Sequence, residues 1–389
     1  MGCKYLNRIS AVAISLFLMI SLGRTTPAKG TINYPIFHKG MTYVSWTRES
    51  FSGIKSDESL RAMSDTGVNC VSVVPTWYQD DFDSIEMTST EKTPSDEGVR
   101  RVIRKARELG MLVMLKPHID LINQTDNSRS DIGFQTDEDW EAWFENYTDF
   151  ISHYARIAEE EHAEFFCIGT ELSFATTRTD GWKGKVIPAV RKLFSGQITY
   201  AANWDEYSNV QFWSDLDYAG IDAYFPLSQG SRPTVDDIKE GWKRWLSEIE
   251  KWQAGIQKPV IFTECGYCSS DSAAARPWEE AVSGEANMNI QADCYKAVFE
   301  TFWDKPWFFG VYWWNWNTYS GSGGPGNRHF TPQNKLAMEY VRSWYAKSKD
   351  RAVDFRNAEL EERLELENIK RSERYEIKEK DIEKRRPMI

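Results

Sequence analysis

The chain has 389 residues, enough for one large domain or two ordinary ones, and a formal net charge of −11 at pH 7. Its Lys and Arg residues form no basic stripe along the sequence. Nucleic acid is therefore not expected as a partner, because the neutralisation of phosphates needs clustered positive charge.

Residues 1–28 are predicted to be a secretory signal peptide. Lys4 and Arg8 precede an apolar stretch from Ile9 to Leu22, which is followed by small and polar residues. This stretch is short for a membrane span, so we expect cleavage near Gly23 or Ala28 and a secreted, extracellular protein. The alternative is an uncleaved signal anchor or a lumenal protein, and no other association with a membrane is expected.

Residues 38–346 alternate between short apolar runs and helical patterns. Eight runs are predicted to be strands: Met41–Trp46, Cys70–Pro75, Leu112–Pro117, Phe165–Glu171, Ile198–Asn203, Tyr218–Tyr224, Pro259–Glu264 and Phe309–Trp316. Seven segments are predicted to be helices: Glu58–Thr66, Ser95–Leu109, Asp137–Glu161, Trp182–Phe194, Val235–Gln253, Asn289–Trp303 and Pro332–Tyr345. The connection after Asn203 is the least helical one and is expected to hold only a short turn around Asn209–Trp213.

The residues at the ends of these elements support the assignment. Asp57, Ser95 and Thr234 are expected to cap helix N-termini, and Gly67 and Gly110 to follow helix C-termini.

The order of the elements predicts the fold class. The strands are almost continuously apolar, which is typical of a parallel sheet covered on both faces. Eight such units favour α/β architecture with a single (β/α)₈ TIM barrel. An open doubly wound sheet is the alternative, but no Gly-x-Gly-x-x-Gly follows the first strand.

The character of the sequence changes after the barrel. Residues 347–389 are rich in charges of both signs and contain only scattered Leu and Ile. We expect a charged tail that is a solvated, fraying helix or disordered, with a coiled-coil or docking helix as the alternative. No feature of the sequence indicates an oligomeric state.

Two glutamates carry the functional prediction. Glu171 and Glu264 are lone carboxylates at the ends of apolar strands, about three repeats of ~31 residues apart in a barrel of ~250 residues. Carboxylates at these strand ends face one pocket, and a facing pair is the equipment of glycoside hydrolysis. A separation of roughly 5–5.5 Å would indicate a retaining mechanism and about 6.5–9.5 Å an inverting one. No cofactor is implied, because two carboxylates suffice.

Strand alternation predicts which residues share the pocket side. If Glu264 points inward, Phe262 and Val260 should do so too, and Thr263 and Ile261 should face the helices. On the earlier strand, Glu171 should share its side with Gly169 and Cys167, unless a bulge breaks the alternation.

Polar and aromatic residues at the other strand ends are candidates for binding sugar hydroxyls and sugar faces. The predicted substrate-binding residues are Trp46, Lys116, His118, Asn203, Asp222, Tyr224 and Trp314. The 17 Trp residues suit such a cleft, although most aromatic rings must fill the core.

Several motifs resemble glycoside hydrolase family 113. They are Lys39-Gly40-Met41-Thr42-Tyr43, Met114-Leu115-Lys116-Pro117-His118, Ile168-Gly169-Thr170-Glu171, Ala202-Asn203-Trp204-Asp205, Gly220-Ile221-Asp222-Ala223-Tyr224-Phe225, Phe262-Thr263-Glu264-Cys265-Gly266-Tyr267 and Tyr312-Trp313-Trp314. The resemblance implies a retaining (β/α)₈ glycosidase with endo-β-1,4-mannanase activity. It further implies Glu171 as acid/base, Glu264 as nucleophile, Tyr224 near the nucleophile and Trp314 as the floor of the cleaved sugar's subsite.

The sequence departs from the wider clan at two places. Many clan members have an Asn immediately before the acid/base, and this Asn bonds the sugar 2-hydroxyl. Here the residue is Thr170, which resembles family 113 rather than the wider clan. Cys265 and Cys268 flank the turn after Glu264, where neither is expected, and a redox or metal role for this Cys-x-x-Cys is an open alternative. The pairing of Cys265, Cys268 and Cys294 is not specified by the sequence.

Two rival functions remain at this point. A non-catalytic carbohydrate-binding barrel would keep the Trp residues but would not need both glutamates. A metal-dependent hydrolase could use His118 and Asp120, but the chain has only five His and no His-x-His pair. The choice between mannose and glucose, and between endo and exo attack, also stays open.

Overall fold

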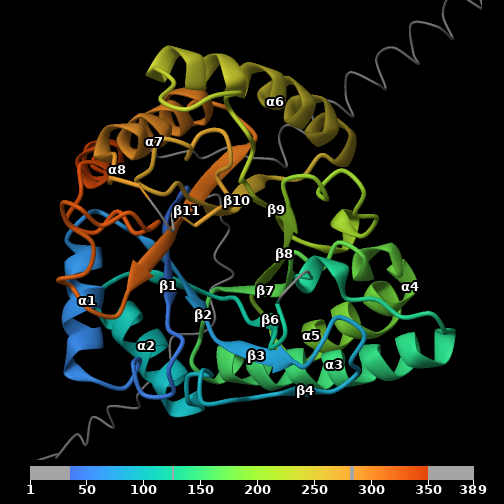
Figure 1. Cartoon of the computed structure of the whole chain (residues 1–389). Helices are drawn as coiled ribbons and strands as arrows, with labels where there is room; N and C mark the ends of the chain where they lie inside the picture. Colours follow the sequence, from blue (N-terminus) through green and yellow to red (C-terminus); the bar gives the residue numbers. More distant parts are fainter. Residues whose placement is uncertain (1–35, 125–126, 281–283, 349–389) are drawn as a thin grey trace, which may run out of the picture. The chain divides into compact units, whose positions relative to one another are not determined.

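Eight parallel strands close into a barrel within the residues described by the computed structural model, which are 36–124, 127–280 and 284–348 (Figure 1). The strand order is β1-β11-β10-β9-β8-β7-β5-β2. The bounds are β1 (His38–Val44), β2 (Cys70–Val74), β5 (Leu112–Leu115), β7 (Phe165–Thr170), β8 (Gln197–Asn203), β9 (Ala219–Asp222), β10 (Val260–Cys265) and β11 (Phe308–Asn317). The predicted (β/α)₈ barrel is confirmed, and the open sheet is excluded.

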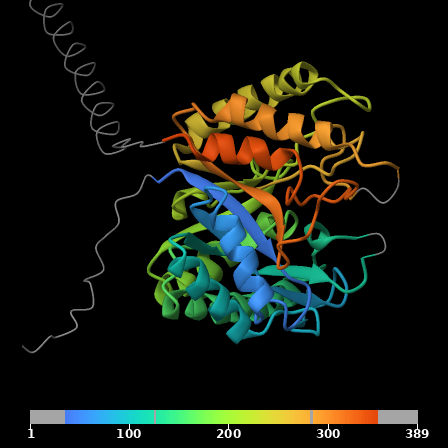
Figure 2. The ribbon, with the colours of Figure 1, turned by 90° about the vertical axis from the view of Figure 1, so that its left-hand side faces the viewer.

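The helices lie outside the barrel and cover its strands (Figure 2). They are α1 (Ile54–Ser64), α2 (Asp96–Glu108), α3 (Asp137–Glu160), α4 (Thr179–Gly181), α5 (Ile187–Leu193), α6 (Val235–Ile256), α7 (Met288–Phe302) and α8 (Ala337–Tyr345), with a π-helical stretch, η3 (Trp182–Val186), joining α4 to α5. Between β8 and β9 the chain forms only the short 3₁₀ turn η4 (Trp213–Asp215), so this connection is indeed the least helical one. None of the helices in the described ranges is long and apolar enough to cross a membrane.

Helix ends follow the expected chemistry with one exception. The Ser95 side chain accepts a hydrogen bond from the Gly98 N–H, and Thr234 forms a capping box with Asp237. The prediction for Asp57 is wrong, because α1 starts one turn earlier, after Gly53. Asp57 instead lies in the first turn, where its negative charge is favourable beside the helix N-terminus.

Two glycines end helices as predicted. Gly67 and Gly110 have φ angles of +87° and +81°, in the left-handed region where a Cβ is disfavoured.

The predicted strand alternation on β10 is wrong. Ile261 belongs to the cluster that fills the barrel interior, whereas Phe262 packs on Phe302 of α7 with ring centroids 4.8 Å apart. The pairing of β10 with β9 shifts register between Phe262 and Glu264. This irregularity lets Glu264 turn to the pocket although its alternation partner Phe262 faces the helices.

A similar irregularity occurs on β7. Cys167 lies in the interior cluster, but a Cβ on Gly169 would stand 2.8 Å from the Tyr147 hydroxyl and 2.9 Å from the Trp182 ring, on the helix side. The register with β8 shifts between Cys167 and Thr170. Gly169 and Cys167 therefore do not share a side, so both catalytic candidates follow breaks in the strand pattern.

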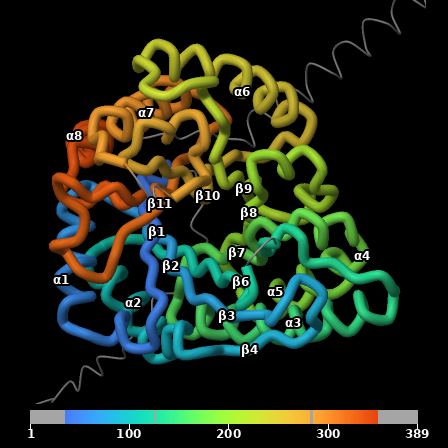
Figure 3. The backbone as a smooth tube through the Cα atoms, viewed as in Figure 1, coloured from blue at the N-terminus to red at the C-terminus, as the bar shows by residue number. Residues whose placement is uncertain are grey.

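A small second sheet, which was not predicted, sits beyond two of the barrel strands (Figure 3). It comprises β3 (Thr76–Gln79), β4 (Met87–Thr88) and β6 (His118–Leu121) in the order β4-β3-β6. Pro75 and Pro117 separate β3 and β6 from the barrel strands before them, since proline cannot donate to a strand ladder. The extension places His118 and Asp120 at the rim.

The signal peptide of residues 1–28 lies outside the described residues. The same holds for the charged tail, except for Lys347 and Ser348. Both assignments stay predictions.

Candidate active site

Glu264 lies at the end of β10 in a dense set of partners. Its side chain is only 6% exposed, and one oxygen, Oε1, contacts the Lys116 ammonium. The Tyr224 hydroxyl donates a 2.8 Å hydrogen bond to Oε2, and His118 Nε2 lies 3.6 Å from Oε1. Lys116 follows β5, His118 begins β6 and Tyr224 follows β9. These side chains therefore meet only when the barrel closes.

Lys116 and Asp222 form a buried ion pair behind Glu264. Lys116 Nζ lies 3.5 Å from Asp222 Oδ2, both side chains are fully buried, and the Thr263 hydroxyl donates to Asp222 Oδ1 at 2.7 Å. Burial lowers the pKa of Lys116, but the carboxylates of Asp222 and Glu264 outweigh it and raise that pKa above its ordinary value. Lys116 thus stays positive beside Glu264.

Glu171 follows β7 and is more open, with 22% of its side chain exposed. Its φ angle of +52° places a non-glycine residue in the left-handed region, a sparsely populated conformation that is often found at functional sites. Burial, which the nearby Arg129 opposes and the charge of Glu264 reinforces, raises the pKa of Glu171 to about 7. Its carboxyl is therefore partly protonated near neutral pH.

His118 connects the surroundings of the two glutamates. Arg129 Nη1 lies 3.1 Å from His118 Nδ1 and 3.7 Å from Glu171 Oε2. Burial, together with the charges of Lys116 and Arg129, lowers the pKa of His118 well below its ordinary value, so the ring is neutral. Because a guanidinium only donates, Nδ1 accepts and the ring proton is on Nε2. Among the described residues, Nε2 has no hydrogen-bond partner.

Arg129 was missed by sequence reasoning. It lies in the short 3₁₀ turn η1 (Arg129–Asp131) between β6 and α3, and its other guanidinium nitrogen is 3.6 Å from Asp120 Oδ2. An irregular segment of this kind has no periodicity that would place a side chain, so the sequence carried no signal for it.

A cavity of about 330 Å³ opens beside Glu171. Its described lining residues are Asp120, Gln124, Asn127, Ser128, Arg129, Ser130, Glu171 and Asn203. Two of the predicted site residues, Glu171 and Asn203, thus share one polar cavity. Such a lining suits a hydroxyl-rich ligand.

Trp314 and Trp46 provide aromatic surface at the Glu264 end. The Trp314 ring is nearly parallel to that of His118, with centroids 6.2 Å apart, and Trp46 meets Trp314 edge to face at 6.5 Å. Trp46 is 46% exposed, so its face is accessible to a ligand. The peptide bond between Trp314 and Asn315 is cis.

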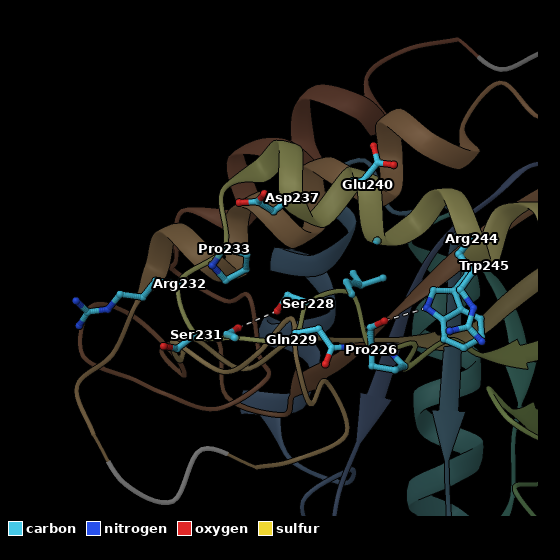
Figure 4. A pocket seen from close by; sticks show the side chains of 13 residues that line it. Pro226, Ser228, Gln229, Ser231, Arg232, Pro233, Asp237, Glu240, Arg244 and Trp245 are labelled. Atoms are coloured by element: carbon cyan, nitrogen blue, oxygen red, sulfur yellow. Dashed lines mark hydrogen bonds between the residues drawn. The ribbon is translucent and has the colours of Figure 1, made fainter.

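A larger cavity of about 630 Å³ lies elsewhere on the rim, between the segment 226–233 and the first half of α6 (Figure 4). The Trp245 ring at its edge is covered by the Arg244 guanidinium, 4.4 Å from the ring centroid, and its Nε1 donates to Pro226 O at 2.9 Å. None of the predicted site residues lines this cavity. The candidate active site is therefore the smaller one.

The cysteines of the described part are all buried and free: Cys70, Cys167, Cys265, Cys268 and Cys294. Burial raises the pKa of the Cys265 thiol above its ordinary value, which makes it a poor nucleophile. Over the same ranges, no group of three or more His, Cys, Asp or Glu side chains is placed to hold a metal ion.

Comparison with known proteins adds the family. The model of Glycoside Hydrolase Family 113 matches residues 41–335. Two solved structures of a GH113 β-1,4-mannanase, one of them a complex, are 28% and 29% identical to this chain, with a TM-score of 0.73, and the alignments cover 81% of this chain and 100% of those chains. The GH113 β-mannanase AaManA from Alicyclobacillus acidocaldarius, in complex with ManMIm, is 26% identical, with a TM-score of 0.73, over 80% of this chain and 98% of that chain. Comparison with curated proteins finds no match.

The family match spans the barrel from β1 to the start of the last helix, including both glutamates and the residues around them. It agrees with the closed parallel barrel and with a rim that carries two carboxylates. The chain therefore belongs to glycoside hydrolase family 113 and is a glycosidase.

Proposed function

We propose that this glycosidase hydrolyses β-1,4-linked mannan-type polysaccharides or oligosaccharides with retention of configuration. The substrate class is supported by the GH113 β-mannanases that align with this chain at 26–29% identity over nearly their full length. The mechanism is supported above all by one observation, the unlike surroundings of Glu171 and Glu264.

Glu264 has the surroundings of a nucleophile. The Lys116 ammonium and the Tyr224 hydroxyl both contact its carboxylate, and groups that donate to the charged form favour it. In the first step a Glu264 oxygen attacks the anomeric carbon as the glycosidic bond breaks. Covalent attachment then neutralises Glu264, while Lys116 remains as the partner of Asp222.

Glu171 has the surroundings of an acid/base. With a pKa of about 7 it can hold a proton in the free enzyme and give it to the leaving oxygen. Once Glu264 is glycosylated, one of the charges that raise this pKa is gone, while Arg129 and Lys116 still lower it. Glu171 is then ready to take a proton from the water that releases the sugar.

Three further predicted site residues, Asn203, Trp314 and Trp46, fit substrate binding, whereas His118 and Asp222 are buried. The buried Nε2 of His118 lies 3.6 Å from Glu264 Oε1, so this ring borders the carboxylate that we propose as the nucleophile. Asn203 shares the cavity with Glu171. Trp314 and Trp46 offer ring faces on which a pyranose can stack.

The test is product analysis with purified protein on mannan, glucomannan and cellulose oligosaccharides, with the Glu171→Gln/Glu264→Gln double variant as the inactive control. We expect oligosaccharides from the mannan substrates only. Proton NMR of the first products should show the β-anomer, which indicates retention. Initial release of the α-anomer would refute the double displacement. Tight binding of all the sugars without cleavage would instead favour the non-catalytic barrel.

We also propose that residues 1–28 direct secretion, on the basis of the charged and apolar pattern of this segment. N-terminal sequencing of protein from the culture medium should begin near residue 24 or 29. Recovery of the full-length chain in the membrane fraction would favour the uncleaved anchor.

A further inference from the structure

A third carboxylate, Glu206, is buried close to the active site but is not among the proposed catalytic or substrate-binding residues. It is 3% exposed and lies just after β8. The Tyr200 hydroxyl donates to its Oε1 at 2.9 Å, the Thr176 hydroxyl lies 2.9 Å from the same oxygen, and the Asn203 N–H donates to Oε2 at 2.9 Å. Donors thus approach both oxygens, as an ionised carboxylate requires.

These contacts lead to the backbone of the acid/base. The Tyr200 hydroxyl, while donating to Glu206, accepts a 2.7 Å hydrogen bond from the N–H of Leu172, the residue after Glu171. The N–H of Glu171 itself donates to Ala201 O at 2.8 Å. Two consecutive N–H groups are therefore held by β8, one directly and one through the pair of Tyr200 and Glu206.

Glu171 needs such support because of its conformation. A side chain at φ +52° is disfavoured, and the strand register with β8 has already shifted before this residue. Thr176, in the turn η2 (Ala175–Thr177), ties the chain after Glu171 to the same carboxylate. The segment 171–176 is thus fixed at both ends by groups on or after β8.

We propose that Glu206 is a positioning residue: through Tyr200 it holds the Leu172 N–H and, with it, the left-handed conformation that directs Glu171 to the cavity. The proposal rests on the proposed role of Glu171 as acid/base. The negative charge of Glu206 also supports the role of Glu171 as an acid, since it is one of the causes that raise the pKa of Glu171.

The test compares Tyr200→Phe and Glu206→Gln with wild type. Tyr200→Phe removes only the bridging hydroxyl. The ring stays packed on Trp182 and Phe212, so we expect this variant to fold. Tyr43→Phe is the matched control, because it also removes a buried tyrosine hydroxyl, one that contacts Ser56 in α1 and no residue of β7 or β8.

Two substrates separate positioning from a general structural effect. A mannan oligosaccharide needs a proton from Glu171 on its leaving oxygen, whereas a 2,4-dinitrophenyl β-mannoside does not. We expect both variants to lose about tenfold or more of kcat/KM on the oligosaccharide, a part of what general acid catalysis contributes. On the activated mannoside they should stay within about twofold of wild type, and the control should match wild type on both substrates.

Equal losses on the two substrates, or no loss on either, would overturn the proposal. If wild-type protein cleaves neither substrate, it is the proposed function that fails. Positioning is then decided by a crystal structure of the Tyr200→Phe variant. A Glu171 that leaves the left-handed region supports the positioning role, and an unchanged backbone at Glu171 and Leu172 refutes it.

Discussion

The two ends of the active site offer the same functional group in opposite surroundings. At one end Glu264 is almost fully buried, between a lysine ammonium and a tyrosine hydroxyl. At the other end, Glu171 opens to a polar cavity. Its nearest positive charge among the described residues is Arg129, whose Nη1 lies 3.7 Å from Oε2, and its pKa is about 7. The comparison shows how partners, more than burial alone, give two carboxylates unlike surroundings, and the proposed roles of nucleophile and acid rest on this difference.

The strongest test of this division is to remove the nucleophile. Glu264→Gln should lower kcat on mannan oligosaccharides by at least about a thousandfold, because no other group can form the covalent intermediate. Steady-state kinetics and thermal unfolding measure the effect. The matched control is Glu58→Gln on the exposed face of α1, which should retain full activity. A Glu264→Gln rate close to that of wild type would remove the basis of the comparison.

Removing the acid should give a different pattern. Glu171→Ala should lose about a hundredfold to a thousandfold of kcat/KM on oligosaccharides but far less on a dinitrophenyl mannoside, whose leaving group needs no proton. Added azide should restore turnover of the activated substrate, by attacking the intermediate in place of water. If both substrates lose activity equally, Glu171 does not act as the acid.

The exposed Trp46 sharpens the comparison on the Glu264 side. Trp46→Ala should lower kcat/KM about fivefold on both kinds of substrate, since a stacking contact with the sugar contributes ~1 kcal/mol whatever the leaving group. Kinetics with the two substrates check this. A loss confined to the oligosaccharide would place Trp46 on the leaving-group side instead.

The surroundings of Glu171 should set the pH dependence, and Lys116 is one of the charges that act on it. With wild type, kcat/KM should fall as the pH rises through about 7, because Glu171 then loses the proton it must donate. Lys116 lowers the pKa of Glu171, so Lys116→Met should move this alkaline limb to higher pH. A pH–rate profile of both proteins measures the shift. A limb that stays in place would show that Lys116 does not act on Glu171.

The smallest effect concerns stability. The pKa of Glu171 is raised in the fold, so the folded state binds more protons than the unfolded state between about pH 4.5 and 7, and stability is lost as pH rises through this window. Glu171→Gln should therefore be more stable than wild type at pH 8, by on the order of 1 to 2 kcal/mol after allowance for solvent screening. The difference should vanish below pH 4, which denaturant titration at both pH values can show.

The regular part of the fold could be predicted because its signals are local. Apolar runs marked the eight barrel strands, and Ser95 and Thr234 marked helix starts with side chains that reach backbone N–H groups three residues away. The misplaced cap at Asp57 shows the limit of such signals, since an acidic residue is equally favourable one turn inside the helix.

The site was only partly predictable. Placing Glu171 and Glu264 at one rim needed no more than strand ends in a parallel barrel. The side each residue faces depended on register shifts in β7 and β10, and these arise from pairing between strands far apart in sequence. Arg129 comes from an irregular turn, and its approach to His118 depends on the small sheet that Pro117 separates from β5.

The sequence by itself determined the eight barrel strands, most of the helices and the pair of glutamates at strand ends, because apolar runs, helical patterns and chain order are properties of neighbouring residues. Only the tertiary structure decided the surroundings of each glutamate. The chemistry of a carboxyl depends on the charges and donors within a few ångströms. Lys116 and Tyr224 reach Glu264, and Arg129 reaches Glu171, from other strands and turns. The surroundings of both glutamates thus form only when the barrel closes.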